Sequence, residues 1–316
     1  MKIPATLLIA FNRPKETKEV FDAIRNAKPR KLYIATDGAR ITHPNDTILL
    51  EETRKIFDNI DWECEVKTLH SEVNQGCKVA VSSAIDWFFK HEEVGIILED
   101  DCKPSLSFFH FCDEMLNRYR DDNRVMQISG SHLVSNHNSH YPYSYYFTRL
   151  NDIWGWATWR RAWKHFSLDM PNYLEFKKGS NLQNYGLKPE ITKWLQSYLD
   201  DTYFNDSRIW SIQWTYAMIV NNGLSINPSS NLVENIGFTK DGTGANSSFN
   251  SFNLYNNFKI QSMGNISHPP FILPSSCLES LRFNIIKKTD PRLFLINIII
   301  KWVVNKLRLL KSIFFR

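Results

Sequence analysis

The sequence lacks the features that define several large classes of protein. Its five cysteines include no C-x-x-C pair, and their odd number and irregular spacing favour reduced thiols in a cytosol over a disulfide framework. No run reaches the roughly 20 apolar residues that span a bilayer. The short apolar run Ala5–Phe11 is not followed by a small-residue cleavage site, so it predicts a buried strand and not a signal peptide.

What is present is a chain that can form a full-sized core. Its 316 residues are 43% hydrophobic and 14% aromatic, which excludes disorder for most of the length. Residues 282–316 hold nine Lys or Arg and one acid, whereas the rest of the chain is mildly acidic. This asymmetry indicates a local anionic partner for the tail and argues against nucleic acid as a partner of the body.

The first 130 residues alternate strand-like and helix-like segments. Apolar or alternating runs predict strands at residues 5–11, 31–36, 63–69, 94–98 and 124–129. Helical segments are predicted between them at 15–26, 46–60, 76–91 and 105–120. This rhythm predicts an α/β fold with a mostly parallel sheet covered on both faces. Beyond residue 140 it gives way to an aromatic-rich stretch and to helical regions near 189–200 and 210–221.

Polar residues follow four of the predicted strands, at Asn12-Arg13, Asp37-Gly38, Asn74-Gln75-Gly76 and Glu99-Asp100-Asp101. Ligands of open α/β sheets bind beyond the carboxyl ends of the strands, so we expect these groups to converge. The acidic triplet suits Mg²⁺ or Mn²⁺, which prefer carboxylate oxygens completed by substrate phosphates. Arg13 could pair with the same phosphates, and Asp37 could accept from a base N–H. The alternative for the triplet is a solvated turn that caps the next helix.

At these residues the sequence resembles the GT-A-fold glycosyltransferases, specifically bacterial ones similar in their site to animal N-acetylglucosaminyltransferase I. The resemblance covers roughly residues 5–270 and also includes Trp154 to Trp159, Trp210 to Trp214 and Asn231 to Gly237. It implies a GT-A domain over residues 1–275, with a nucleotide-binding part to about residue 130 and an acceptor part beyond it. Residues 276–316 are predicted to form a basic amphipathic helical tail.

The resemblance also implies roles for individual residues. Asp101 would bind the metal that bridges a diphosphate. The donor nucleotide, a uridine nucleotide, and its sugar would be held by Arg13, Asp37, Asn74, Glu99 and Asp100.

The catalytic base is where this chain departs from the family pattern. The animal relative has an acid within the stretch that corresponds to Trp210–Trp214, where this sequence has Ser211, Ile212 and Gln213. Asp206 is the first candidate for the base, although a helix N-cap explains it equally well. Asp152 and Asp241 are the other candidates.

Two further features concern the acceptor and the metal. Sugar faces pack on indole rings, so Trp154 and Trp156 are candidates for the acceptor site, with core packing as the alternative. His268 could reach the metal, but a lone histidine is more often structural.

The tail has one polar stripe at Asn297, Lys301, Asn305, Arg308 and Ser312. Such a basic amphipathic helix over residues 291–316 is suited to a membrane surface, or its apolar face could dock on the protein or on another subunit.

Together these features predict a metal-dependent, inverting glycosyltransferase that moves a sugar from a UDP-sugar to a saccharide acceptor. A lipid-linked acceptor in bacterial surface polysaccharide or lipopolysaccharide synthesis would fit a peripheral enzyme on the inner face of the cytoplasmic membrane. The alternatives are a sugar-1-phosphate nucleotidyltransferase and a catalytically silent saccharide-binding protein.

Overall fold

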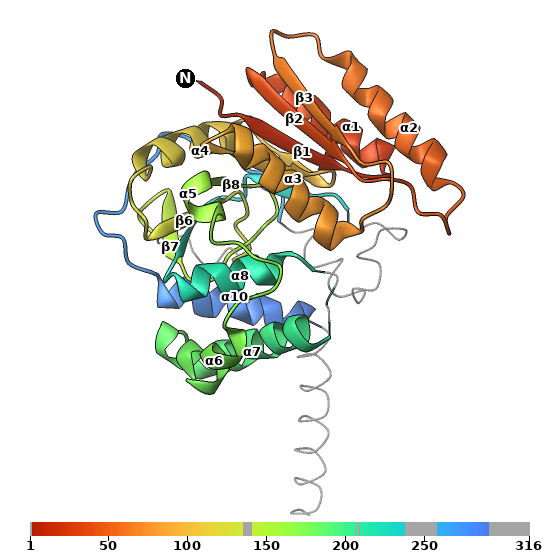
Figure 1. Cartoon of the computed structure of the whole chain (residues 1–316). Coiled ribbons are helices and arrows are strands. Elements are labelled where there is room, and N and C mark those ends of the chain that lie inside the picture. Colours follow the sequence, from red (N-terminus) through yellow and green to blue (C-terminus); the bar gives the residue numbers. More distant parts are fainter. Residues whose placement is uncertain (1, 135–140, 206, 208, 238–257, 291–316) are drawn as a thin grey trace, which may run out of the picture.

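A mixed eight-stranded sheet forms the centre of the protein. The structure, a computed structural model, describes residues 2–134, 141–205, 207, 209–237 and 258–290 (Figure 1). One half of the sheet consists of four parallel strands, in the spatial order β3 (Glu65–His70), β2 (Lys31–Thr36), β1 (Thr6–Ala10) and β4 (Val94–Glu99). All four were predicted from the sequence, because their apolar or alternating runs are separated by helices long enough to form crossover connections.

The other half of the sheet contains the antiparallel strands. Its members, from β4 outward, are β8 (Trp156–Trp159), β6 (Val125–Ser129), β9 (Leu224–Pro228) and β7 (Tyr145–Thr148). Strand β8 runs antiparallel to both β4 and β6, β9 is parallel to β6, and β7 is antiparallel to β9. The predicted α/β class with a mostly parallel, Rossmann-like sheet is therefore confirmed, whereas the two antiparallel strands arise from the aromatic-rich stretch without having been predicted.

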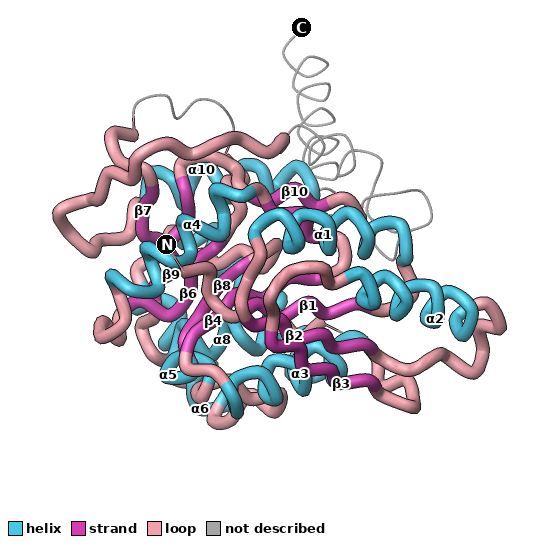
Figure 2. Tube along the Cα trace, turned by 90° about the horizontal axis from the view of Figure 1, so that it is seen from above, coloured by secondary structure: helices cyan, strands magenta, loops and turns pink. Residues whose placement is uncertain are grey.

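Helices cover both faces of the sheet (Figure 2). One face carries α1 (Pro14–Ala27), α2 (Asp46–Ile56) and α4 (Leu106–Arg118), and the other carries α3 (Cys77–His91), α5 (Arg160–Trp163) and α8 (Ser211–Val220). Successive strand residues alternate between the two layers. Leu8 of β1 packs with Phe21 of α1, for example, and Leu7 packs in the layer that contains Phe88 of α3.

An outer helical layer lies against α8 (Figure 1). It consists of α6 (Tyr173–Lys178), α7 (Pro189–Phe204) and α10 (Ser276–Thr289). Leu195 of α7, Ile219 of α8 and Phe283 of α10 belong to one buried apolar cluster. The cluster ties the C-terminal helix into the same body as the sheet.

The first part of the predicted tail is thus built into the body. Glu279 and Arg282 of α10 form buried ion pairs with Arg149 and Asp152, and Asp290 accepts hydrogen bonds from two aromatic side chains of α7. Residues 291–316, with the predicted amphipathic stripe, lie outside the described residues. Within the described part of the chain, no helix has the length and apolar character needed to cross a membrane.

Candidate functional site

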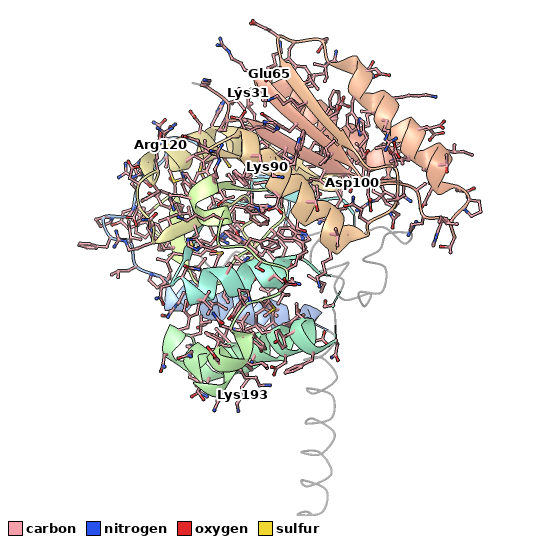
Figure 3. The ribbon with its side chains drawn as sticks, viewed as in Figure 1. Lys31, Glu65, Lys90, Asp100, Arg120 and Lys193 are labelled. Carbon is pink, nitrogen blue, oxygen red and sulfur yellow. The ribbon has the colours of Figure 1, made fainter. Side chains whose placement is uncertain are left out.

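The polar residues that follow the strands meet at one edge of the sheet. Lys31 and Glu65, which begin β2 and β3, lie at one end of these strands, and Asp100, which follows β4, lies at the other (Figure 3). Parallel strands place all their carboxyl ends together, so the backbone direction alone sets this convergence. The structure brings Arg13, Asp37, Asn74 and the acidic triplet to this edge.

Arg13 is the central cation of the site. Its guanidinium lies 2.9 Å from Oδ1 of Asp100 and 2.8 Å from Oδ2 of Asp101, and so bridges the two carboxylates. The other oxygen of Asp100 accepts from the backbone N–H of Phe11 at 3.1 Å. The side chain of Asp100 is 4% exposed and that of Asp101 is 17% exposed, so Asp101 is the more accessible of the two carboxylates that Arg13 bridges.

The electrostatics of this cluster are those of crowded acids held around one cation. Burial, followed by the charges of Asp101 and Asp100, raises the pKa of Glu99. Burial also raises the pKa of Asp100, although the charge of Arg13 opposes the shift. Burial lowers the pKa of Arg13, but the carboxylates of Asp100 and Asp101 more than offset this and raise it overall. An additional cation would relieve this crowding of acids and favour their charged forms.

The donor atoms suit a divalent cation that is shared with a ligand. Carboxylate oxygens are the hard ligands that Mg²⁺ and Mn²⁺ prefer, and these ions usually take one or two carboxylates plus phosphate oxygens. Among the described residues, no three or more His, Cys, Asp or Glu side chains form a complete metal cage. Asp101 could thus supply one ligand to Mn²⁺ or Mg²⁺ only together with a phosphate group, and Arg13 would have to release its oxygen.

Asp37 organises the loop that leads into α3. Its two oxygens accept from the backbone N–H groups of Gly38, Gln75 and Gly76 and from the amide of Asn74, all at 2.9–3.0 Å. Asn74 also donates to the carbonyl of Gly38 at 2.8 Å. These two residues therefore shape the edge of the site in the structure, and their contact with a nucleotide stays a prediction.

A second ion pair supports the same edge and was missed by the sequence reasoning. Asp46, at the start of α2, is buried and accepts from Asn12 at 2.7 Å and from Arg40 at 2.6 and 2.9 Å. The hydrogen bonds from Arg40 lower the pKa of Asp46 to about 2. The ion pair with Arg40 fixes the loop after β2, and the hydrogen bond from Asn12 joins the start of α2 to the end of β1. No local pattern in the sequence indicates this pairing.

A short two-stranded sheet covers Asp101 from the other side. Strand β5 (Cys102–Pro104) pairs antiparallel with β10 (Val233–Asn235). The backbone N–H of Ile236 donates to the carbonyl of Asp101 at 2.8 Å, and Gly237 packs on the Asp101 side chain. The stretch Asn231–Gly237, which the sequence linked to the site through resemblance alone, thus forms one wall of it.

The two predicted acceptor residues occupy different environments. Trp154 is half-buried. Trp156 is 1% exposed and packs between Trp163, Trp210 and Trp214, with ring centroids 5.8–6.1 Å apart. The acceptor role predicted for Trp156 is at odds with this position, because its indole has no free face on which a sugar could pack.

Of the three candidates for the catalytic base, Asp152 is the one that lies within the described residues. Asp206 and Asp241 lie outside the described residues. Asp152 is buried, with Oδ1 2.6 Å from Nη2 of Arg282 and Oδ2 accepting from Asn227 at 3.1 Å. That geometry fits a structural ion pair better than a general base, which needs an oxygen free to accept a proton. His268 contacts Tyr145 and Glu114, and no contact with Asp101 is seen.

Comparisons with known proteins give only remote likenesses. No protein-family model and no curated protein sequence matches this chain. Mouse xyloside xylosyltransferase 1 in its apo form is 14% identical, with 68% of this chain and 81% of that chain covered and a TM-score of 0.32. HddC from Yersinia pseudotuberculosis is 8% identical, with 50% and 77% covered and a TM-score of 0.30. 4-Diphosphocytidyl-2C-methyl-D-erythritol synthase from Anaerococcus prevotii is 7% identical, with 50% and 70% covered and a TM-score of 0.29. Similarities this remote establish neither a family nor a function for this protein.

Proposed function

We propose that this protein is a metal-dependent glycosyltransferase that moves a sugar from a UDP-sugar to a saccharide acceptor. The observation that carries the proposal is the more accessible carboxylate of Asp101 beside Arg13, at the carboxyl edge of a parallel sheet. A nucleoside diphosphate brings two phosphate groups. Their oxygens can share a cation with the carboxylate of Asp101, and they can pair directly with the guanidinium of Arg13.

Each residue of the site is assigned a role in binding the donor. Bound Mn²⁺ or Mg²⁺ would supply a Lewis acid that stabilises negative charge on the leaving diphosphate. Asp101 would hold that ion, and Arg13 would turn from the acids to the phosphates. Glu99 and Asp100 lie beside them for the ribose or the donor sugar, and Asp37 and Asn74 shape the nucleotide side. Asp206, shortly before Trp210 in the sequence, remains our first candidate to take the proton of the acceptor hydroxyl.

Calorimetric titration with UDP tests the proposal directly. We expect micromolar-range binding in the presence of Mn²⁺, weakened at least about tenfold when the metal is removed with EDTA. A screen of UDP-sugars for release of UDP in the presence of saccharides would then identify the donor. Binding of UDP that is indifferent to metal, or no binding at all, would reject the proposed function.

We also propose that residues 291–316 attach the enzyme to an anionic membrane surface, which would place it at the cytoplasmic face near a lipid-linked acceptor. This segment contains six Lys or Arg in the sequence and follows directly after Asp290. Asp290 is fixed by hydrogen bonds of 2.7 Å from Trp194 and 2.8 Å from Tyr198. The segment therefore begins at a defined point on the outer helical layer.

A chain that ends after Asp290 tests this attachment. Each basic residue near an anionic surface contributes about 1 kcal/mol, so the full chain should sediment with vesicles containing phosphatidylglycerol and the shortened chain should not. Binding of UDP should be equal for the two chains, because α10 and its ion pairs remain. Equal sedimentation of both chains, or sedimentation that does not depend on anionic lipid, would contradict the membrane role.

A further inference from the structure

Gly237 lies where a side chain cannot be accommodated. A Cβ atom built on this residue would lie 2.8 Å from Cβ of Asp101 and 2.9 Å from Nη1 of Arg13, and closer still to Oδ2 of Asp101. These are the two groups whose ion pair, 2.8 Å long, forms the centre of the site. The backbone of Gly237 is outside the left-handed region, so its conformation alone does not require glycine. The requirement for glycine comes from the space that the ion pair occupies.

The backbone that leads into Gly237 is held by hydrogen bonds that oppose its retreat from a clash. Its N–H donates to Oδ1 of Asn235 at 2.9 Å, and the N–H of Ile236 donates to the carbonyl of Asp101 at 2.8 Å. Asn235 in turn is paired with Cys102 in the short sheet. Val233, at the start of β10, is 1% exposed. We therefore expect an added methyl group to displace the side chains of Arg13 or Asp101 and to leave the wall in place.

We infer that Gly237 is a positioning residue: by having no side chain, it keeps open the space in which the guanidinium of Arg13 meets the carboxylate of Asp101. This inference rests on the proposed function for its consequence, because the same space would admit the cation and the diphosphate. It extends that function by assigning a role to the wall formed by Asn231–Gly237. The position of Arg13 relative to Asp101 does not itself depend on whether the ligand is UDP.

The test is Gly237→Ala, compared with Gly264→Ala as a matched control. Gly264 is exposed, has no heavy atom within 4 Å of an added Cβ, and is also outside the left-handed region. In the presence of Mn²⁺ we expect Gly237→Ala to weaken the binding of UDP at least about tenfold and Gly264→Ala to leave it unchanged. Equal binding by wild type and Gly237→Ala would overturn the inference.

Unfolding by urea without any ligand separates this inference from the proposed function. We expect Gly237→Ala to lower the urea midpoint of the wild-type chain. In an Arg13→Met background the same substitution should lower the midpoint by less than half as much, because the guanidinium is absent and Asp101 can turn away. Equal losses in the two backgrounds would show that the alanine disturbs only the wall, and would overturn the inference. If the losses differ but the wild type binds no UDP, the proposed function fails while the role of Gly237 in placing Arg13 stands.

Discussion

Asp101→Asn is expected to weaken the binding of UDP in the presence of Mn²⁺ by at least about 100-fold, and to remove the dependence of the remaining binding on metal. Asp101 is the more exposed of the two carboxylates that Arg13 bridges. Loss of one charge from a partly buried charged cluster costs about 2–5 kcal/mol, and 100-fold corresponds to about 2.8 kcal/mol. Titration calorimetry with and without EDTA measures both parts of the effect.

The asparagine variant is chosen because it keeps the shape of the site. Its side chain fits the space beside Gly237, and Arg13 retains its pairing with Asp100 at 2.9 Å. Asp121→Asn, at an exposed position after α4, is the matched control and should bind UDP as the wild type does. If Asp101→Asn bound UDP with unchanged affinity and unchanged metal dependence, Asp101 would not be a metal ligand.

The first half of the fold was accessible from the sequence because its signals are local. The strands β1, β2 and β4 are apolar runs, β3 alternates, and each crossover helix has its own period. The elements β1 to β4 and α1 to α4 were therefore predicted to within a few residues, although β5 was not. Strand β8 carries no such signal. Trp156–Trp159 is a strand because β4 and β6 leave a gap into which it pairs antiparallel, and that gap exists only in the assembled sheet.

The candidate site also has features that could be predicted from the sequence and features that could not. Strand direction fixes which ends share an edge, so the convergence of Arg13, Asp37 and Asp101 followed from the order of the elements alone. Contacts made by side chains across the fold did not. The hydrogen bond between Asn12 and Asp46 and the packing of Gly237 on Asp101 depend on loop paths that no local pattern specifies. The burial of Trp156 could not be predicted for a related reason, because residue type does not reveal that its indole packs against Trp163 of α5 and Trp214 of α8.

Glu279→Leu is expected to lower the free energy of unfolding by about 3–5 kcal/mol, the largest stability effect of any single change we propose. Glu279 is 2% exposed and accepts from Nε, Nη2 and the backbone N–H of Arg149 at 2.8–3.0 Å. Its removal leaves the charge of Arg149 buried between α10 and the segment after β7. Unfolding in urea, monitored by tryptophan fluorescence, measures the loss.

A matched control is available in a second, exposed ion pair of α10. Lys287 of α10 pairs with Glu190 of α7 at 2.7 Å, but their side chains are 31% and 53% exposed. Glu190→Leu should therefore cost less than about 1 kcal/mol, because solvent screens an exposed pair. Replacing both buried partners, in Arg149→Met with Glu279→Leu, should recover most of the loss, since no charge is then left unpaired. If Glu279→Leu and Glu190→Leu cost the same, α10 would not be locked to the body by its buried ion pair. If the buried pair dominates as expected, the stable folded unit of this protein extends to Asp290. A chain that ends before Ser276 should then lose the outer helical layer, whereas a chain that ends after Asp290 should keep it.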